Sequence, residues 1–457
     1  MGRITLQQAA VWCGGKVDPK YSDVTFFGAN IDTRKIEAGQ LFVALQGVRD
    51  GHDFIDVAFE MGAAAVLCTH CDGDYPAIVV SDTRVALGQI AKQERIRLGM
   101  QVIGITGSVG KTTTKEMVAA VLAKKYKVKK TPVNHNNDIG LPMTILGIPE
   151  GTEVAVLEMG MNHFREIAYL SDIAKPNVAV IVNIGTMHIE HLGSMEGILQ
   201  AKLEILEGMD PTGKIILNGD DPLLWNQHKT IPALYFGANN PECTVRGTDV
   251  YEENEQICFN VHYEGVRFAV LLPLEGAHYI SDALAAVTVG LQMGINSEQI
   301  CKALAQFQNA GGRQEIFSVD GRTIIKDCYN AGPESMAAAL AVLHGKTGRR
   351  IAVLGDMLEL GSCTQAEHYK VGRLAAEKAD VLFSFGPNSS KMVKGAITGG
   401  MSAVNARAFE NREKLTDVLT QISRPGDVIL VKGSRGMRME LILDAFLNNI
   451  RTAEDKK

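Results

Sequence analysis

Val102-Ile-Gly-Ile-Thr-Gly-Ser-Val-Gly-Lys-Thr-Thr-Thr114 is the stretch of sequence that decides the fold. It predicts an apolar strand, then a glycine-rich turn, then a helix that begins at Lys-Thr. Gly107 and Gly110 let backbone N–H groups approach phosphate oxygens, and the amino end of the helix adds a partial positive charge. Lys111 can then reach the terminal phosphates of a nucleotide, while the Thr112 hydroxyl is placed to bind Mg²⁺.

The loop matches a shorter form of the phosphate-binding pattern. The full spacing, G-x-x-x-x-G-K-[ST], needs glycine at position 105, where this chain has Ile105. What remains is G-x-x-G-K-T, and a chance Gly-Lys-Thr on a surface turn is the alternative. Because a strand precedes the turn and a helix follows it, we predict a nucleotide-binding loop.

The sequence around this loop predicts three α/β units. Apolar strand-like runs alternate with helical stretches on both sides of Gly311-Gly312-Arg313, which is typical of parallel sheets wrapped by helices. We expect a small amino-terminal α/β domain at 1–95, a central nucleotide-binding domain at 96–312 and a doubly wound, Rossmann-like domain at 313–457. The runs lie at 102–103, 153–158, 178–184 and 214–217 in the central part, and at 323–325, 351–354, 381–385 and 428–431 in the last part.

Length and composition exclude several classes of protein. A chain of 457 residues is too long for one ordinary core, and its net charge of -6 gives no general attraction to nucleic acid. No eighteen apolar residues run together and no secretory signal opens the chain, so we expect a cytoplasmic protein that does not insert into a membrane. The eight cysteines are scattered and are interpreted as reduced thiols, with the Cys68-Thr-His-Cys71 pair as ordinary packing residues.

Three further side chains point to chemistry beside the loop. Glu158 ends the apolar run at 154–157 and His188 follows the next one, so adjacent strands can bring both to the sheet edge that faces the phosphates. Lys202 lies within the apolar stripe of a helix predicted at 195–206, where it must snorkel, be paired, lose its charge or be chemically changed. Glu190 and His191 could make the metal contact instead of His188, but they are interpreted as surface residues.

Several longer segments carry a resemblance to a known family. The central ones are TGSVGKTTTKE at 106–116, NHNNDIGLP at 134–142, LEMGMN at 157–162, NIGTMHIEHLGS at 183–194 and AKLEI at 201–205. In order and spacing they resemble the Mur ligase family. The outer ones are DTRKIEAGQLFVALQGVRDGHDF at 32–54, DCYNAGPESM at 327–336, LGDMLELG at 354–361 and VKGSRGMRME at 431–440. They resemble the branch of that family that joins UDP-N-acetylmuramoyl-tripeptide to D-alanyl-D-alanine, and the likeness is weakest at about 220–270.

The resemblance implies an activity and its partners. It implies an ATP-dependent ligase with two Mg²⁺ ions that activates a carboxylate as an acyl phosphate and forms an amide in peptidoglycan precursor synthesis. A monomer with no nucleic-acid partner is expected. Two alternatives stay open: a related amide ligase that adds a diamino acid or glutamate, and a non-catalytic module that binds ATP to switch a partner.

The resemblance also implies roles for individual residues. Thr112, Glu158, His188 and Lys202, the last as a carbamate, would hold metal, and Lys111 and Arg313 would complete the catalytic set. ATP would contact Gly107, Ser108, Val109, Gly110, Lys111, Thr112, Thr113, His278, Asp282, Arg313, Asp327 and Asn330. The other substrates would contact Asp32, Thr33, Arg34, Asn134, Asn136, Asn137, Lys432, Ser434 and Arg435. Two positions depart from the family: Asp282 stands in place of Asn, and Gly332 in place of the second Asn of Asn-Ala-Asn-Pro.

Overall fold

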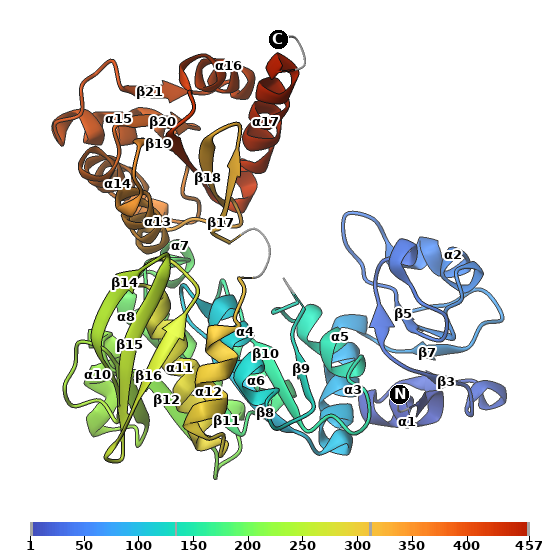
Figure 1. The fold of residues 1–457 in the computed structure, drawn as a ribbon. Coiled ribbons are helices and arrows are strands. Elements are labelled where there is room, and N and C mark those ends of the chain that lie inside the picture. Colours follow the sequence, from blue (N-terminus) through green and yellow to red (C-terminus); the bar gives the residue numbers. More distant parts are fainter. Residues whose placement is uncertain (1–2, 133–134, 310–312, 455–457) are drawn as a thin grey trace.

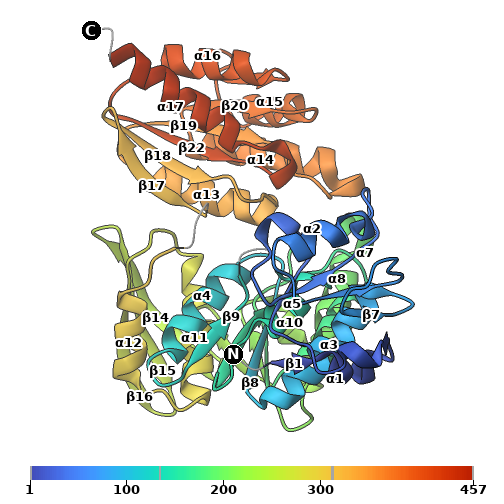
Figure 2. The ribbon, with the colours of Figure 1, turned by 90° about the vertical axis from the view of Figure 1, so that its right-hand side faces the viewer.

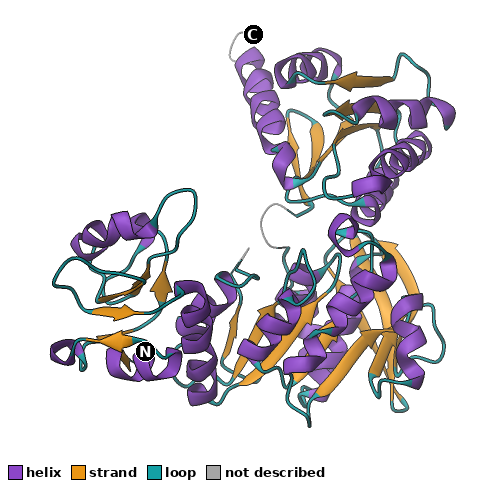
Figure 3. Cartoon of the chain, turned by 180° about the vertical axis from the view of Figure 1, so that it is seen from behind, coloured by secondary structure: helices purple, strands orange, loops and turns teal. Residues whose placement is uncertain are grey.

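A computed structural model describes residues 3–132, 135–309 and 313–454, and it divides the chain into three lobes (Figure 1). The amino-terminal lobe lies to one side of the central lobe, and the carboxy-terminal lobe lies above it (Figures 1 and 2). All three mix helices and strands (Figure 3), which confirms the predicted α/β class. Within the described ranges, no helix is both long and apolar enough to cross a membrane.

The amino-terminal lobe contains a five-stranded sheet in the order β2-β7-β6-β5-β4. Strand β2 runs antiparallel to β7, and the other pairs are parallel. The inner strands β5 and β6 are buried along their whole length, as expected of strands covered on both faces. Its elements are β1 Ile4–Thr5, α1 Leu6–Cys13, β2 Lys16–Val17, β3 Thr25–Phe26, β4 Ala29–Asn30, β5 Leu41–Val43, α2 Ile55–Glu60, β6 Ala65–Cys68, β7 Ala77–Val79 and α3 Thr83–Leu98.

The central lobe is built on a nine-stranded sheet in the order β16-β15-β14-β13-β12-β11-β8-β10-β9. Strands β8 to β14 pair in parallel, so the carboxyl ends of β8, β10 and β11 meet at one edge. The elements up to β13 are β8 Gln101–Thr106, α4 Lys111–Leu122, β9 Val128–Lys130, α5 Gly140–Leu146, β10 Val154–Glu158, α6 Glu166–Ala174, β11 Val178–Ile181, α7 Ile189–Leu192, α8 Met195–Leu203, α9 Ile205–Gly208, β12 Lys214–Asn218, α10 Pro222–Trp225 and β13 Leu234–Gly237.

An antiparallel ribbon that the sequence patterns did not predict extends this sheet. Strands β14 (Val245–Glu253), β15 (Gln256–Tyr263) and β16 (Val266–Leu272) alternate buried and exposed residues along much of their length, because one face packs on the lobe and the other faces solvent. Helices α11 (Tyr279–Gln292) and α12 (Ser297–Ala305) follow and, with α4, cover one face of the central sheet.

The carboxy-terminal lobe is doubly wound, as predicted. Its sheet has the order β17-β18-β22-β19-β20-β21, with β17 antiparallel and the rest parallel. Its elements are β17 Glu315–Val319, β18 Arg322–Asp327, α13 Pro333–Gly345, β19 Arg349–Gly355, α14 Thr364–Lys378, β20 Val381–Phe385, α15 Ser389–Thr398, β21 Ala406–Phe409, α16 Arg412–Ile422, β22 Asp427–Lys432 and α17 Glu440–Glu454.

The first two lobes each have an apolar cluster of their own and also share one. One apolar cluster joins the amino-terminal lobe to the second face of the central sheet, from Ile4 through Leu87 to Ile198. The carboxy-terminal lobe has two clusters of its own, one on each face of its sheet. The domain boundary expected at 95–96 falls inside α3 and stays a prediction.

Candidate functional site

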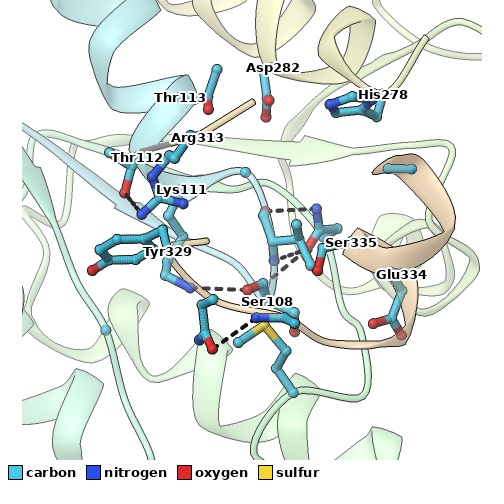
Figure 4. Close-up of a pocket in the computed structure, with 18 of the residues that line it drawn as sticks. Ser108, Lys111, Thr112, Thr113, His278, Asp282, Arg313, Tyr329, Glu334 and Ser335 are labelled. Carbon is cyan, nitrogen blue, oxygen red and sulfur yellow. Dashed lines mark hydrogen bonds between the residues drawn. The ribbon is translucent and has the colours of Figure 1, made fainter. Parts of the chain in front are cut away.

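The main cavity lies between the central and carboxy-terminal lobes and has a volume of about 470 Å³. It opens at the carboxyl ends of β8 and β10, the edge where open α/β sheets bind ligands. Figure 4 shows the loop after β8 facing residues that follow β18. Of the predicted site residues, Ser108 to Thr113, Asn136, Asn137, Glu158, His188, His278, Asp282, Arg313, Asp327, Asn330 and Lys432 line this cavity.

The loop before α4 has the geometry of a phosphate cradle. Gly110 caps the helix with a left-handed φ of 84°, a conformation that other residues adopt only at a cost. The Lys111 ammonium folds back over the loop and donates to the carbonyl oxygens of Gly107 at 2.7 Å and Ser108 at 3.1 Å. Burial lowers the pKa of Lys111 to about 8, and the charge of Arg313 acts in the same direction while Glu158 opposes it.

Asn183, which was not among the predicted site residues, fixes the shape of this loop. Its side-chain oxygen accepts from the backbone N–H groups of Ser108 at 3.0 Å and Val109 at 2.9 Å, and its amide donates to the Val109 carbonyl. The Ser108 hydroxyl donates to the Gly185 carbonyl at 3.1 Å. The only local signal for Asn183 was its position directly after a buried strand.

Thr112, Glu158 and Arg313 form the polar centre of the cavity. The Thr112 hydroxyl donates to a Glu158 oxygen at 2.8 Å, and the Arg313 guanidinium donates to the same hydroxyl at 2.9 Å. Arg313 also stacks on the Tyr329 ring, with its guanidinium carbon 4.0 Å from the ring centre (Figure 4). The Asn136 amide donates to the other Glu158 oxygen at 2.9 Å. A carboxylate, a hydroxyl and a guanidinium therefore meet beside the loop.

Lys115 supports Glu158 from below and was also missed by the sequence patterns. It is fully buried on α4, donates to the Thr131 carbonyl at 2.8 Å, and lies 3.1 Å from Glu116 and 3.7 Å from Glu158. A buried ammonium between two carboxylates offsets their repulsion. Within an apolar helix face it could not be told from a solvated lysine by spacing alone.

His188 lies in the main cavity, but its partner comes from the carboxy-terminal lobe. It caps α7 with a left-handed φ of 66°, and its Nδ1 lies 2.5 Å from Glu359. Among the described residues, no group of three or more His, Cys, Asp or Glu side chains is close enough together to hold a metal ion. The predicted metal ligands, which include a threonine and a lysine, are not of that kind and stay a prediction; the hydroxyl of Thr112 and the carboxylate of Glu158 are the hard oxygen donors that Mg²⁺ prefers.

Lys202 is buried rather than snorkelling. Its residue is 2% exposed, and the described part of the chain offers its ammonium neither a hydrogen bond nor an ion pair. Burial, together with the charge of Lys111, lowers the pKa of Lys202 well below its ordinary value. Of the alternatives left open by the sequence, loss of charge or chemical change fits this position.

Asp282 and His278 begin α11 and line the side of the cavity next to the loop. Asp282 accepts from the Thr114 hydroxyl at 2.7 Å, and a Cβ at Gly110 would lie 2.4 Å from its oxygen. Burial raises the pKa of Asp282 to about 7 and lowers that of His278 to about 4. The carboxyl that replaces the family's Asn thus packs directly against the phosphate loop.

The remaining predicted residues of the carboxy-terminal lobe form a connected group. Lys432 is buried and donates to Asp327 at 2.6 Å and to the Asn330 carbonyl at 3.0 Å. The Ser434 hydroxyl donates to the Ala331 carbonyl. Ser434 and Arg435 line a smaller cavity of about 250 Å³ next to the main one, whereas Lys432 does not.

The amino-terminal residues lie away from the main cavity. Asp32 caps a short 3₁₀ turn, Thr33–Lys35, and pairs with the exposed Arg34 at 2.8 Å, which lowers the pKa of Asp32 to about 2. None of the three predicted residues here lines either cavity described above. Asn134 lies outside the described residues.

Comparisons with known proteins agree with this architecture. The chain matches the Mur ligase family, catalytic domain, over 25–95, the Mur ligase middle domain over 105–290 and the Mur ligase, glutamate ligase domain, over 312–435. A UDP-N-acetylmuramoyl-tripeptide–D-alanyl-D-alanine ligase of Bacillus subtilis is 41% identical and covers 94% of this chain and 95% of its own length. Its Escherichia coli namesake is 36% identical over 98% of this chain and 99% of its own.

Solved structures extend the likeness to three dimensions. MurF from Acinetobacter baumannii superposes with a TM-score of 0.90 at 32% identity, covering 98% of this chain and 99% of its own. MurF ligase from Thermotoga maritima, solved in complex with ADP, gives a TM-score of 0.82 at 29% identity over 93% and 98% of the two chains. With relatives above 30% identity along nearly its whole length, this chain belongs to the Mur ligase family.

Proposed function

We propose that this chain is an ATP-dependent ligase that joins the tripeptide carboxylate of UDP-N-acetylmuramoyl-tripeptide to the amino group of D-alanyl-D-alanine. The relatives that carry this name match the chain almost end to end. The observation that carries the proposal is the group of Thr112, Glu158 and Arg313 beside the loop. It lies in a cavity lined by the central and the carboxy-terminal lobes. A reaction that needs ATP and a second substrate fits a site shared between lobes.

The chain's charges suit the two steps of such a reaction. In the first, a carboxylate oxygen attacks the γ-phosphorus of ATP and ADP leaves. Lys111 and Arg313 offset the repulsion between the two anions. In the second, the amine attacks the acyl carbon, the C–N bond forms, the bond to the phosphate oxygen breaks, and the amine loses a proton as phosphate leaves. Holding the three substrates with their reacting atoms next to one another provides much of the rate enhancement.

Magnesium is part of the proposal, with Thr112 and Glu158 as ligands and His188 and Lys202 beside a second ion. When bound, Mg²⁺ neutralises phosphate charge that the side chains alone leave unbalanced. Lys202 supports this set as a carbamate, because a buried amine with a lowered pKa is uncharged and therefore able to add CO₂. The product is an anionic oxygen donor in place of a cation.

Phosphate release with a panel of amines tests the function. With ATP and the UDP-linked tripeptide, we expect turnover with D-alanyl-D-alanine and none with lysine, diaminopimelate or glutamate. Turnover with one of the latter instead would assign the chain to a different amide ligase, and nucleotide binding without any amine-dependent release would indicate a switch. The eight cysteines are free thiols, which supports a protein that works in the reducing cytoplasm.

A further inference from the structure

The smaller cavity, of about 250 Å³, adjoins the main one at His188. Its walls come from the central lobe and from three segments of the carboxy-terminal lobe, at 330–332, 358–360 and 434–436. The residues common to both cavities are Asn162, Met187, His188, Asn330 and Ala331. A small molecule held in the smaller cavity is therefore next to whatever reacts in the larger one.

Two opposite charges line this smaller cavity. Among its described lining residues, Glu359 is the one carboxylate and Arg435 the one guanidinium. The Arg435 side chain is 68% exposed, and the described residues offer it one ion pair, with Glu440 at 3.3 Å. Glu359 uses one oxygen for His188, and its other oxygen accepts no hydrogen bond from any described residue. An acceptor and a donor are thus both available to a ligand.

The backbone at Glu359 holds its carboxylate in place. Its φ of 62° is left-handed, which is uncommon for a residue other than glycine and is found where neighbouring contacts enforce it. On either side, the Leu358 N–H donates to the Ser434 hydroxyl at 2.9 Å and the Leu360 side chain is buried. The turn is therefore fixed, and the carboxylate remains at the junction of the two cavities.

We propose that Glu359 binds the amino group of the incoming dipeptide, while Arg435 binds its carboxylate at the far end of the same cavity. This inference rests on the proposed function. A zwitterionic dipeptide separates its two charges by a peptide unit, whereas a free amino acid carries both on one carbon. The carboxylate of a free amino acid would be repelled by Glu359, so Glu359 and Arg435 together select a dipeptide. The amino nitrogen of the bound dipeptide then lies beside the main cavity.

The test begins with Glu359→Gln, which removes the charge and keeps the shape. With ATP and tripeptide saturating, we expect the KM for D-alanyl-D-alanine to rise tenfold or more and the KM for ATP to stay the same. Glu359→Asp keeps the charge and should recover part of the loss. Glu190→Gln is the matched control, because Glu190 is exposed at the same interface and lines neither cavity.

Hydroxylamine separates dipeptide binding from an effect through His188. As a small nucleophile it traps an acyl phosphate without filling the dipeptide site, so Glu359→Gln should trap as fast as the unmodified chain. D-alanyl-D-alaninamide lacks the carboxylate. Its KM should therefore be the same for Arg435→Ala as for the unmodified chain, whereas Glu359→Gln should still raise it.

Two results would overturn the assignment of Glu359. One is an unchanged KM for the dipeptide in Glu359→Gln. The other is a loss of hydroxylamine trapping as large as the loss of turnover with the dipeptide, which would make Glu359 a residue that orients His188. Either result leaves the proposed function standing. Failure of the unmodified chain to consume the dipeptide at all would instead remove the proposed function.

Discussion

Replacing Asp282 with Asn should stabilise the protein at neutral and alkaline pH. Asp282 is buried beside the phosphate loop and accepts a hydrogen bond from Thr114. Burial raises its pKa from 3.8 to about 7, and the bond from Thr114 and the charge of Arg313 offset only part of that shift. Asn keeps an oxygen to accept from Thr114 and removes the charge.

The sign and size of the effect follow from the two pKa values of Asp282. Below about pH 4 the carboxyl is protonated in both the folded and the unfolded chain, so the free energy of unfolding does not depend on it. Between about pH 4 and about pH 7 the unfolded chain loses the proton first, and stability falls by about 1.4 kcal/mol per pH unit. Above pH 7 the penalty stays constant at roughly 4 kcal/mol, an upper limit on what Asn can recover.

Calorimetric unfolding of both chains from pH 5 to pH 8 measures this difference. The advantage of Asp282→Asn should grow with pH and level off above 7. Asp249→Asn is the control, because hydrogen bonds from Thr248 and Asn260 lower the pKa of Asp249, so its carboxylate stays ionised in the folded and the unfolded chain over this whole range and the difference should not change with pH. An advantage that stays the same at every pH would refute the reasoning.

The remaining predictions concern the loop and its supports. Lys202→Ala should abolish turnover, and added short carboxylic acids should restore part of it; near-normal activity without them would mean that Lys202 only packs. Gly110→Ala should weaken ATP binding at least tenfold in calorimetric titration, because a left-handed alanine costs about 1 kcal/mol or more and its Cβ would lie 2.4 Å from Asp282. Lys115→Met should lower kcat, since Glu158 and Glu116 lose the cation that lies between them. An unchanged kcat would mean that Lys115 does not support Glu158.

Local patterns predicted the elements of the site that depend on neighbouring residues. The strand, turn and helix around Lys111 follow from their own spacing, and the structure places Glu158 opposite Ile105 at the end of paired parallel strands. The alternation of strands and helices also predicted the parallel sheets of the central and carboxy-terminal lobes. These features need no knowledge of distant contacts.

Features decided by distant contacts were not predictable in this way. The pair of His188 and Glu359 joins residues 171 positions apart, and the ribbon at 245–272 depends on which strand each segment meets. Whether Lys202 reached water or stayed buried depended on what covered its helix, so the sequence left both outcomes open. The residues next to these positions in the sequence do not indicate which distant residues they contact.

The apolar cluster that joins the first two lobes constrains how this chain can be divided. Cutting the chain near residue 95 would expose the apolar surface of this shared cluster on each fragment, so neither fragment is expected to fold by itself. The third lobe closes its own cores and meets the rest largely through polar pairs such as Glu334 with Thr186 and Lys346 with Glu275. Recombination between related chains can therefore exchange the last lobe separately, whereas the first two lobes can be exchanged only together.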